Sequence, residues 1–127
     1  MNRAVNPARL APPAAAYSHA VHTVHAARWL HTSGVVPTRA DGTVPDGIAE
    51  QAAAVWDNIA ALLDEVGMVA SDVVSVTTYV VAGNALGPVM AARDAAMAGH
   101  RPASTLLLVP ALAQAAWQME IAVVAAR

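Results

Sequence analysis

The sequence contains no cysteine and few charged residues, and each shortage excludes a class of function. With no cysteine among 127 residues, disulfide bonds, thiolate metal sites and cysteine nucleophiles are excluded. Charged residues make up only 13% of the chain, the net charge is −2, and no run of basic residues occurs. This balance argues against a nucleic-acid-binding surface and against a patch that binds anionic membranes.

Long hydrophobic runs are also missing. The chain is 57% hydrophobic, yet no apolar run approaches the ~20 residues that a membrane span needs. Pro12 and Pro13 interrupt any signal-peptide core, so we expect no secretion signal and a cytoplasmic protein. The length suits a single domain, with residues 1–16 as a loosely held arm. High apolar content with so little charge predicts that part of the surface is buried against other copies of the chain.

Five segments have the composition of strands. They are rich in β-branched and aromatic residues or alternate between apolar and polar positions. We expect the first two, both between Tyr17 and Gly34, to form a hairpin that turns at Ala26–Arg28. The predicted strands lie around Val21–Val24 and at Trp29–Thr32, Val73–Val81, Thr105–Val109 and Trp117–Ala125.

Two segments have helical periodicity. The first begins at about Asp46, which is a good N-cap residue, and ends at Gly67. The second covers residues 85–98 and ends at Gly99, but Arg93 falls within its apolar stripe. The apolar face of the first helix comprises Ile48, Ala52, Val55, Ile59, Leu62, Leu63 and Val66.

This order of elements predicts an α+β fold. Strands that alternate with helices in so short a chain favour one mixed sheet with both helices packed on one face. The other face of the sheet would then be bare. Since bare apolar sheet faces are normally covered, we expect other subunits to cover it.

The five histidines raise the possibility of a metal site. His19, His22 and His25 are three residues apart and would align on a helix. In a strand, however, His22 faces away from the other two. No cluster of carboxylates accompanies them, so we expect structural histidines and no metal.

Several motifs lie along nearly the whole chain: Tyr17, Thr32-Ser33-Gly34 followed by Pro37, Val76–Val80, Pro102-Ala103 and Glu120–Val123. Together they resemble the RidA/YjgF family of reactive-intermediate deaminases. The resemblance implies a six-stranded sheet and a homotrimer around a central barrel, with three ligand clefts between subunits. It also implies hydrolysis of small enamines and imines, such as 2-aminoacrylate, to a keto acid and ammonia, without a cofactor.

The chain departs from the family pattern at three positions. The family's arginine directly after Pro-Ala is here Ser104, and its acidic residue on the last strand aligns with Gln118. The asparagine of the second helix aligns with Met90. The resemblance therefore implies Gln118, Ser104 and Glu120 as catalytic candidates. The substrate-binding candidates are Tyr17, Ser33, Gly34, Met90, Ala103, Ser104 and Thr105.

Two hypotheses follow from these departures. The first is a divergent enamine or imine deaminase-like hydrolase, in which Ser104, Gln118 and main-chain amides bind substrate and position water. The second is a trimer that binds a small metabolite or has a regulatory role without turnover, since a serine holds a carboxylate more weakly than an arginine does. Glu120 can act as a catalyst or as a structural contact between subunits. Arg101 lies at an odd offset from Ser104 on an extended segment, which argues against its replacing the missing arginine.

Overall fold

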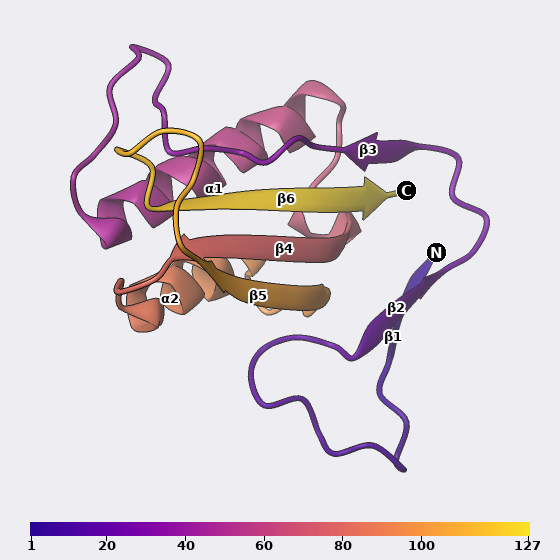
Figure 1. Ribbon diagram of the computed structural model, residues 1–127. Coiled ribbons are helices and arrows are strands. Elements are labelled where there is room, and N and C mark those ends of the chain that lie inside the picture. The colour runs from indigo at the N-terminus through magenta and orange to yellow at the C-terminus, as the bar shows by residue number, and fades with distance from the viewer.

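The computed structural model describes residues 1–127 and contains six strands, two α-helices and one short 3₁₀ helix (Figure 1). This confirms the predicted α+β class. Neither helix is long and apolar enough to cross a membrane. The elements are β1 (Asn2–Val5), β2 (Ala20–Thr23), β3 (Trp29–His31), α1 (Ile48–Glu65), η1 (Ala70–Asp72), β4 (Val73–Val81), α2 (Leu86–Met97), β5 (Ala103–Val109) and β6 (Met119–Ala126).

The six strands divide into a four-stranded sheet and a separate hairpin. The sheet has the order β3-β6-β4-β5, in which β4 and β5 are parallel and β6 is antiparallel to both of its neighbours. The hairpin of β1 and β2 lies apart from this sheet, as Figure 1 shows, and only an isolated bridge joins Ser18 to Ala103. The six strands of the implied sheet are thus present, but they do not form one continuous sheet.

The hairpin predicted at Ala26–Arg28 is wrong, because the two strands that flank it pair elsewhere. The N–H groups of Ala27 and Arg28 both donate to the carbonyl of Arg127, which directs β3 to the C-terminal strand. β2 pairs instead with β1, a strand that the sequence did not predict within residues 1–16. Asn2 fixes this strand, since its Nδ2 donates to the carbonyl of Ala126 at 2.8 Å.

The helices end where their sequences predict but begin slightly later. α1 has Gly47 as its N-cap, without a capping side chain, so the prediction of Asp46 is wrong by one residue. Gly67 follows the C-cap with a φ of +66°, which confirms it as the residue that terminates α1. α2 ends at Met97, and its C-cap residue Ala98 has a left-handed φ of 49°.

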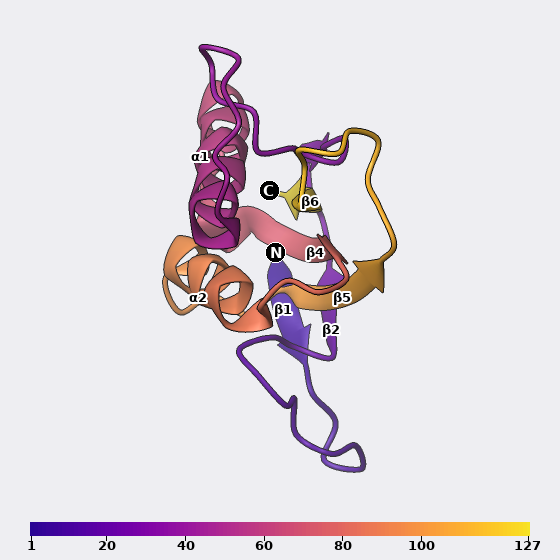
Figure 2. The same cartoon turned by 60° about the vertical axis from the view of Figure 1, so that its left-hand side comes forward.

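Both helices cover the same face of the sheet, as Figure 2 shows. Between them and the sheet lies an apolar core in which Ile59, Val76 and Ile121 are each at most 1% exposed. Alternate residues of the central strands point to the opposite face, which no helix covers. On β4 and β6 these residues are half-buried, and Leu107 of β5 is 41% exposed. We call this surface the open face: Ser75, Thr77, Tyr79, Thr105, Leu107, Glu120, Ala122 and Val124.

Candidate functional site

The first group of candidate residues lies where the segment after β3 continues alongside β6. Val35 pairs with Ile121 through two backbone hydrogen bonds, of 2.7 and 3.0 Å, and the side chain of the adjacent Glu120 reaches Gly34. The approach is close. A methyl group built on Gly34 would lie 2.8 Å from Oε2 of Glu120. A side chain at position 34 would therefore displace the carboxylate, and glycine leaves room for it.

Glu120 carries a carboxylate that the rest of the chain does not use. It is half-buried on the open face, directly opposite Tyr79 of β4, and no hydrogen bond or ion pair engages its oxygens. A carboxylate without a partner can accept a proton or orient a water molecule.

Ser33 and Gly34 also line a cavity of about 390 Å³ between the segment after β3 and helix α1. Asn58 of α1 holds this segment, since its Nδ2 donates to the carbonyls of Val36 and Thr38 at 3.1 and 2.9 Å. The main chain around Gly34 is thus held on one side by α1 and on the other by β6.

The second group lies at the start of β5. Ser18 fixes the chain there, because its N–H donates to the carbonyl of Pro102 at 3.0 Å and its hydroxyl donates to the carbonyl of Arg101 at 2.6 Å. These contacts hold Ser18, and not Tyr17, next to Ala103; the Tyr17 hydroxyl accepts from the N–H of Ala14 at 3.3 Å, and its ring meets His19 edge-on. Ser104, the next residue of β5, points toward the helices, because it pairs with Val76, a residue of the buried face.

Arg93 of α2 also belongs to this second group, and its role is absent from the sequence prediction. Its Nη1 donates to Oγ of Ser104 at 3.4 Å, while its Nε and Nη2 both donate to Oδ1 of Asp94, at 3.1 and 3.0 Å. The only signal in the sequence was a charged residue within the apolar stripe of the helix. Met90 is half-buried three residues earlier, which places it on the same side of α2.

The two groups lie on opposite faces of the sheet within one chain. Ser104 is on the helix-covered face, whereas Glu120 and Thr105 are on the open face. A single copy therefore does not bring Ser104 and Glu120 together around one small ligand.

Gln118 lies in a structural network rather than against Gly34. Its Oε1 accepts from Nδ2 of Asn84 at 3.0 Å, and its Nε2 donates to the carbonyl of Ala115 at 3.1 Å. Its backbone N–H donates to Oε1 of Gln51 at 2.8 Å. The structure therefore brings Glu120, and not Gln118, next to the Ser33–Gly34 segment.

Gln51 is a buried polar residue that the sequence did not single out, and we predict a large effect on stability. It is 0% exposed, and its Nε2 donates to the carbonyls of Pro45 and Ala116 at 2.7 and 2.8 Å. The substitution Gln51→Ala leaves these groups unpaired, so we expect the free energy of unfolding to fall by roughly 2–4 kcal/mol. Urea denaturation measures this change, with the exposed Gln114→Ala as the control. A loss as small as the control's would contradict a structural role for the network.

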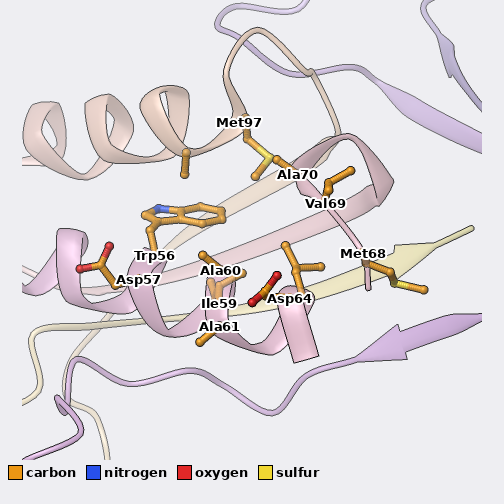
Figure 3. A pocket seen from close by; sticks show the side chains of 12 residues that line it. Trp56, Asp57, Ile59, Ala60, Ala61, Asp64, Met68, Val69, Ala70 and Met97 are labelled. Carbon is orange, nitrogen blue, oxygen red and sulfur yellow. The ribbon is translucent and has the colours of Figure 1, made fainter. Parts of the chain in front are cut away.

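A larger cavity of about 570 Å³ lies elsewhere, between the helices. Figure 3 shows Trp56 of α1 and Met97 of α2 in this cavity, with Asp57 and Asp64 among the residues that line it. Ten of its twelve lining residues are hydrophobic, and none is a candidate site residue. The sequence motifs thus point away from this cavity and toward the two groups on the sheet.

Comparison with known proteins identifies the family. The sequence model described as Endoribonuclease L-PSP matches residues 8–127. The chain belongs to the RidA/YjgF family. Its fold resembles YyfB of Yersinia pestis, a Rid family protein of unknown function, with a TM-score of 0.90 and 30% identity over 99% of this chain and 98% of that one. The YjgF gene product of E. coli has a TM-score of 0.73 and 26% identity over 98% of each chain.

One further RidA/YjgF structure shares the fold. E. coli TdcF with bound serine superimposes with a TM-score of 0.73 and 20% identity, over 98% of this chain and 94% of that one. Among curated proteins, a sequence search gives no significant match.

Proposed function

We propose that the protein is a deaminase-like hydrolase of small imines or enamines derived from amino acids. Water adds to the imine carbon, the carbon–nitrogen bond breaks, and a keto acid and ammonia leave. The observation that carries this proposal is the unpartnered carboxylate of Glu120 beside Gly34, because hydrolysis needs a group that orients water and accepts its proton. The resemblance of the fold to TdcF, which holds serine, supports an amino-acid-sized ligand.

The proposed reaction takes place in clefts between copies of the chain, in a homotrimer. Two observations support this assembly. The open face exposes Leu107 without a cover, and Ser104 and Glu120 lie on opposite faces of one sheet. A second copy packed on the open face would bury apolar surface and could add its own residues to a cleft beside Glu120.

The direct test measures keto-acid release from enzymatically generated 2-iminopropionate, with and without the protein. Faster release than the spontaneous rate supports the proposal. Release at the spontaneous rate, combined with tight binding of a keto acid, would support the second hypothesis of a metabolite-binding protein without turnover.

The substitution Gly34→Ala tests whether the close approach to Glu120 matters for the reaction. The added methyl group, 2.8 Å from Oε2 and 2.9 Å from Cδ, forces the carboxylate to move. We expect kcat for 2-iminopropionate to fall by about 10- to 100-fold, since such displacements disrupt reactive geometry. Stability should change by less than about 1 kcal/mol, because the group that must move is the end of a flexible side chain.

Gly87→Ala is the matched control for this variant. Gly87 lies in α2, and a methyl group there meets no atom within 4 Å. We expect this variant to keep the parental kcat and to change stability by no more than about 1 kcal/mol, since alanine favours the helix but Pro88 disfavours a helical residue with a Cβ before it. Parental activity in Gly34→Ala as well would contradict the role given to the Gly34–Glu120 approach.

A further inference from the structure

Arg93 is buried in a place where the surrounding pattern requires an apolar residue. It is 6% exposed in the middle of α2, and the buried residues one turn before and after it are Val89 and Met97. Burying a charged guanidinium is costly unless the group is paired and hydrogen-bonded. The position of Arg93 therefore calls for a partner that satisfies its charge.

The residues that contact Arg93 within the chain compensate its charge and use its hydrogen-bond donors only in part. Asp94 accepts from Nε and Nη2 through a single oxygen, and its side chain is 47% exposed, so the ion pair is weakened by solvent. Ser104 is neutral, and its Oγ lies 3.4 Å from Nη1, at the long end of the hydrogen-bond range. A guanidinium has five N–H donors. Three are engaged here, which leaves two for a further acceptor.

The guanidinium lies behind an open edge of the sheet. β5 is the last strand in the order β3-β6-β4-β5, and its outer edge has no backbone partner beyond the bridge from Ser18 to Ala103. Ser104 is half-buried just past this bridge. Because Arg93 contacts Ser104, a small ligand that bonds to the Ser104 hydroxyl at this edge would also lie close to the guanidinium.

We infer that Arg93 binds the carboxylate of the ligand, with the Ser104 hydroxyl as a second donor. A planar carboxylate matches the fork of the guanidinium, which can donate two parallel hydrogen bonds. The inference rests on the proposed function, because it names the group that holds the substrate's carboxylate end. It also explains how a chain with serine at position 104 can retain a cation at the start of β5.

Asp94 narrows the class of anion. Arg93 and Asp94 together give a local net charge near zero. A singly charged carboxylate can therefore bind there with little electrostatic repulsion. A dianionic phosphate would place two more negative charges beside Asp94 and would be repelled. The site therefore favours small monocarboxylates, such as keto acids and amino acids, over inorganic phosphate.

The first test is calorimetric titration of the full-length protein with pyruvate, the keto acid that 2-iminopropionate yields, and with inorganic phosphate. We expect pyruvate to bind and phosphate to bind at least tenfold more weakly. Arg93→Gln should weaken pyruvate binding by about 10- to 100-fold, since a charge-assisted pair is lost. Arg93→Lys should be intermediate, because lysine keeps the charge and loses the fork.

Asp94→Asn keeps the inference testable if the buried Arg93 variants fail to fold. This residue is half exposed, and its substitution removes the negative charge that competes with the ligand for the guanidinium, although the amide oxygen of asparagine still accepts hydrogen bonds. We expect pyruvate to bind several-fold more tightly. Arg101→Gln is the control, because Arg101 is exposed and no contact of its guanidinium is present, and its affinity for pyruvate should equal that of the parent.

Ser104→Arg distinguishes two cases: a site in which Arg93 already supplies the cation, and a site that has no cation. If Arg93 already supplies the cation, a second guanidinium within hydrogen-bond reach of it repels it, and pyruvate binds more weakly than to the parent. A gain in affinity or in hydrolysis with Ser104→Arg would overturn the role of Arg93.

The two proposals fail in different ways. Pyruvate binding that depends on Arg93, without hydrolysis of 2-iminopropionate, overturns the proposed reaction and supports this inference. Hydrolysis in which Arg93→Gln keeps the parental KM overturns this inference and leaves the reaction standing. Absence of pyruvate binding to the parent protein overturns the inference directly.

Discussion

Glu120→Gln should lower kcat for 2-iminopropionate hydrolysis by at least about 100-fold, in line with the loss of a general base. The amide has nearly the shape of the carboxylate, so it still fits beside Gly34, but it does not accept a proton from water. KM should change little, because the inferred anchor for the substrate's carboxylate is Arg93, on the other face of the sheet. Steady-state assays of keto-acid release measure both constants.

Two variants serve as controls. One tests the effect of losing a carboxylate elsewhere in the chain, and the other tests Gln118 as the alternative catalytic residue. Glu65→Gln removes one carboxylate from the exposed end of α1 and should keep the parental kcat. Gln118→Glu places a carboxylate where Gln118 now accepts from Asn84, two residues from Glu120, and should not rescue Glu120→Gln. If Glu120→Gln hydrolysed the imine at the parental rate, Glu120 would instead be a structural contact, as the sequence allowed.

The sequence predicted the parts of the fold that depend on local pattern. The strand β4 occupies the predicted residues Val73–Val81, and Ile59 on the predicted apolar face of the 18-residue helix α1 is buried, although Leu62 of the same face is 41% exposed. The alternation along β6 places Ile121 in the core and Glu120 on the opposite face. A strong local pattern suffices where burial on one side decides the structure.

The pairing of the short strands could not be predicted in the same way. β1 has four residues, and β3 has three, so neither carries enough pattern to identify its partner. Their partners are determined by long-range contacts, such as the bond from Asn2 to Ala126 across the whole chain. A hairpin was expected because β2 and β3 are neighbours in sequence, but the hydrogen bonds of Ala27 and Arg28 to Arg127 prevent it.

The site was only partly predictable, because its contacts join residues far apart in sequence. Motifs identified Gly34 and Glu120 separately, and only the register between Val35 and Ile121 brings them together. Arg93 stood out in the sequence as a misplaced charge in an apolar stripe. Its contact with Ser104 depends on how α2 packs against β5, which the sequence of neither element specifies.

Leu107→Asp should dissociate the proposed trimer, because it places a charge on the open face in every copy. Leu107 is 41% exposed and pairs with Tyr79 of β4, which in turn pairs with Glu120 of β6. In an assembly that covers this row, each copy would lose the burial of the part of the leucine that one chain leaves exposed, 41%, worth about 1 kcal/mol. Each copy would also have to bury an unpaired carboxylate, and the free-energy cost of burying this charge is larger than the loss of the apolar contact.

Light scattering coupled to size-exclusion chromatography gives the mass of the assembly. We expect the parent at three times the chain mass of 13.0 kDa, and Leu107→Asp near the mass of one chain. Leu62→Asp is the matched control, because Leu62 is equally exposed but lies on α1, on the covered side of the sheet, and its assembly mass should not change.

The monomeric variant also tests where the reaction takes place. Ser104 and Glu120 lie on opposite faces of one sheet, so a dissociated chain has no cleft that contains both. Hydrolysis should therefore fall together with the assembly mass, while circular dichroism still reports a folded chain. A folded monomer that hydrolyses 2-iminopropionate at the parental rate would show that one chain is sufficient, and the proposed cleft between copies would be wrong.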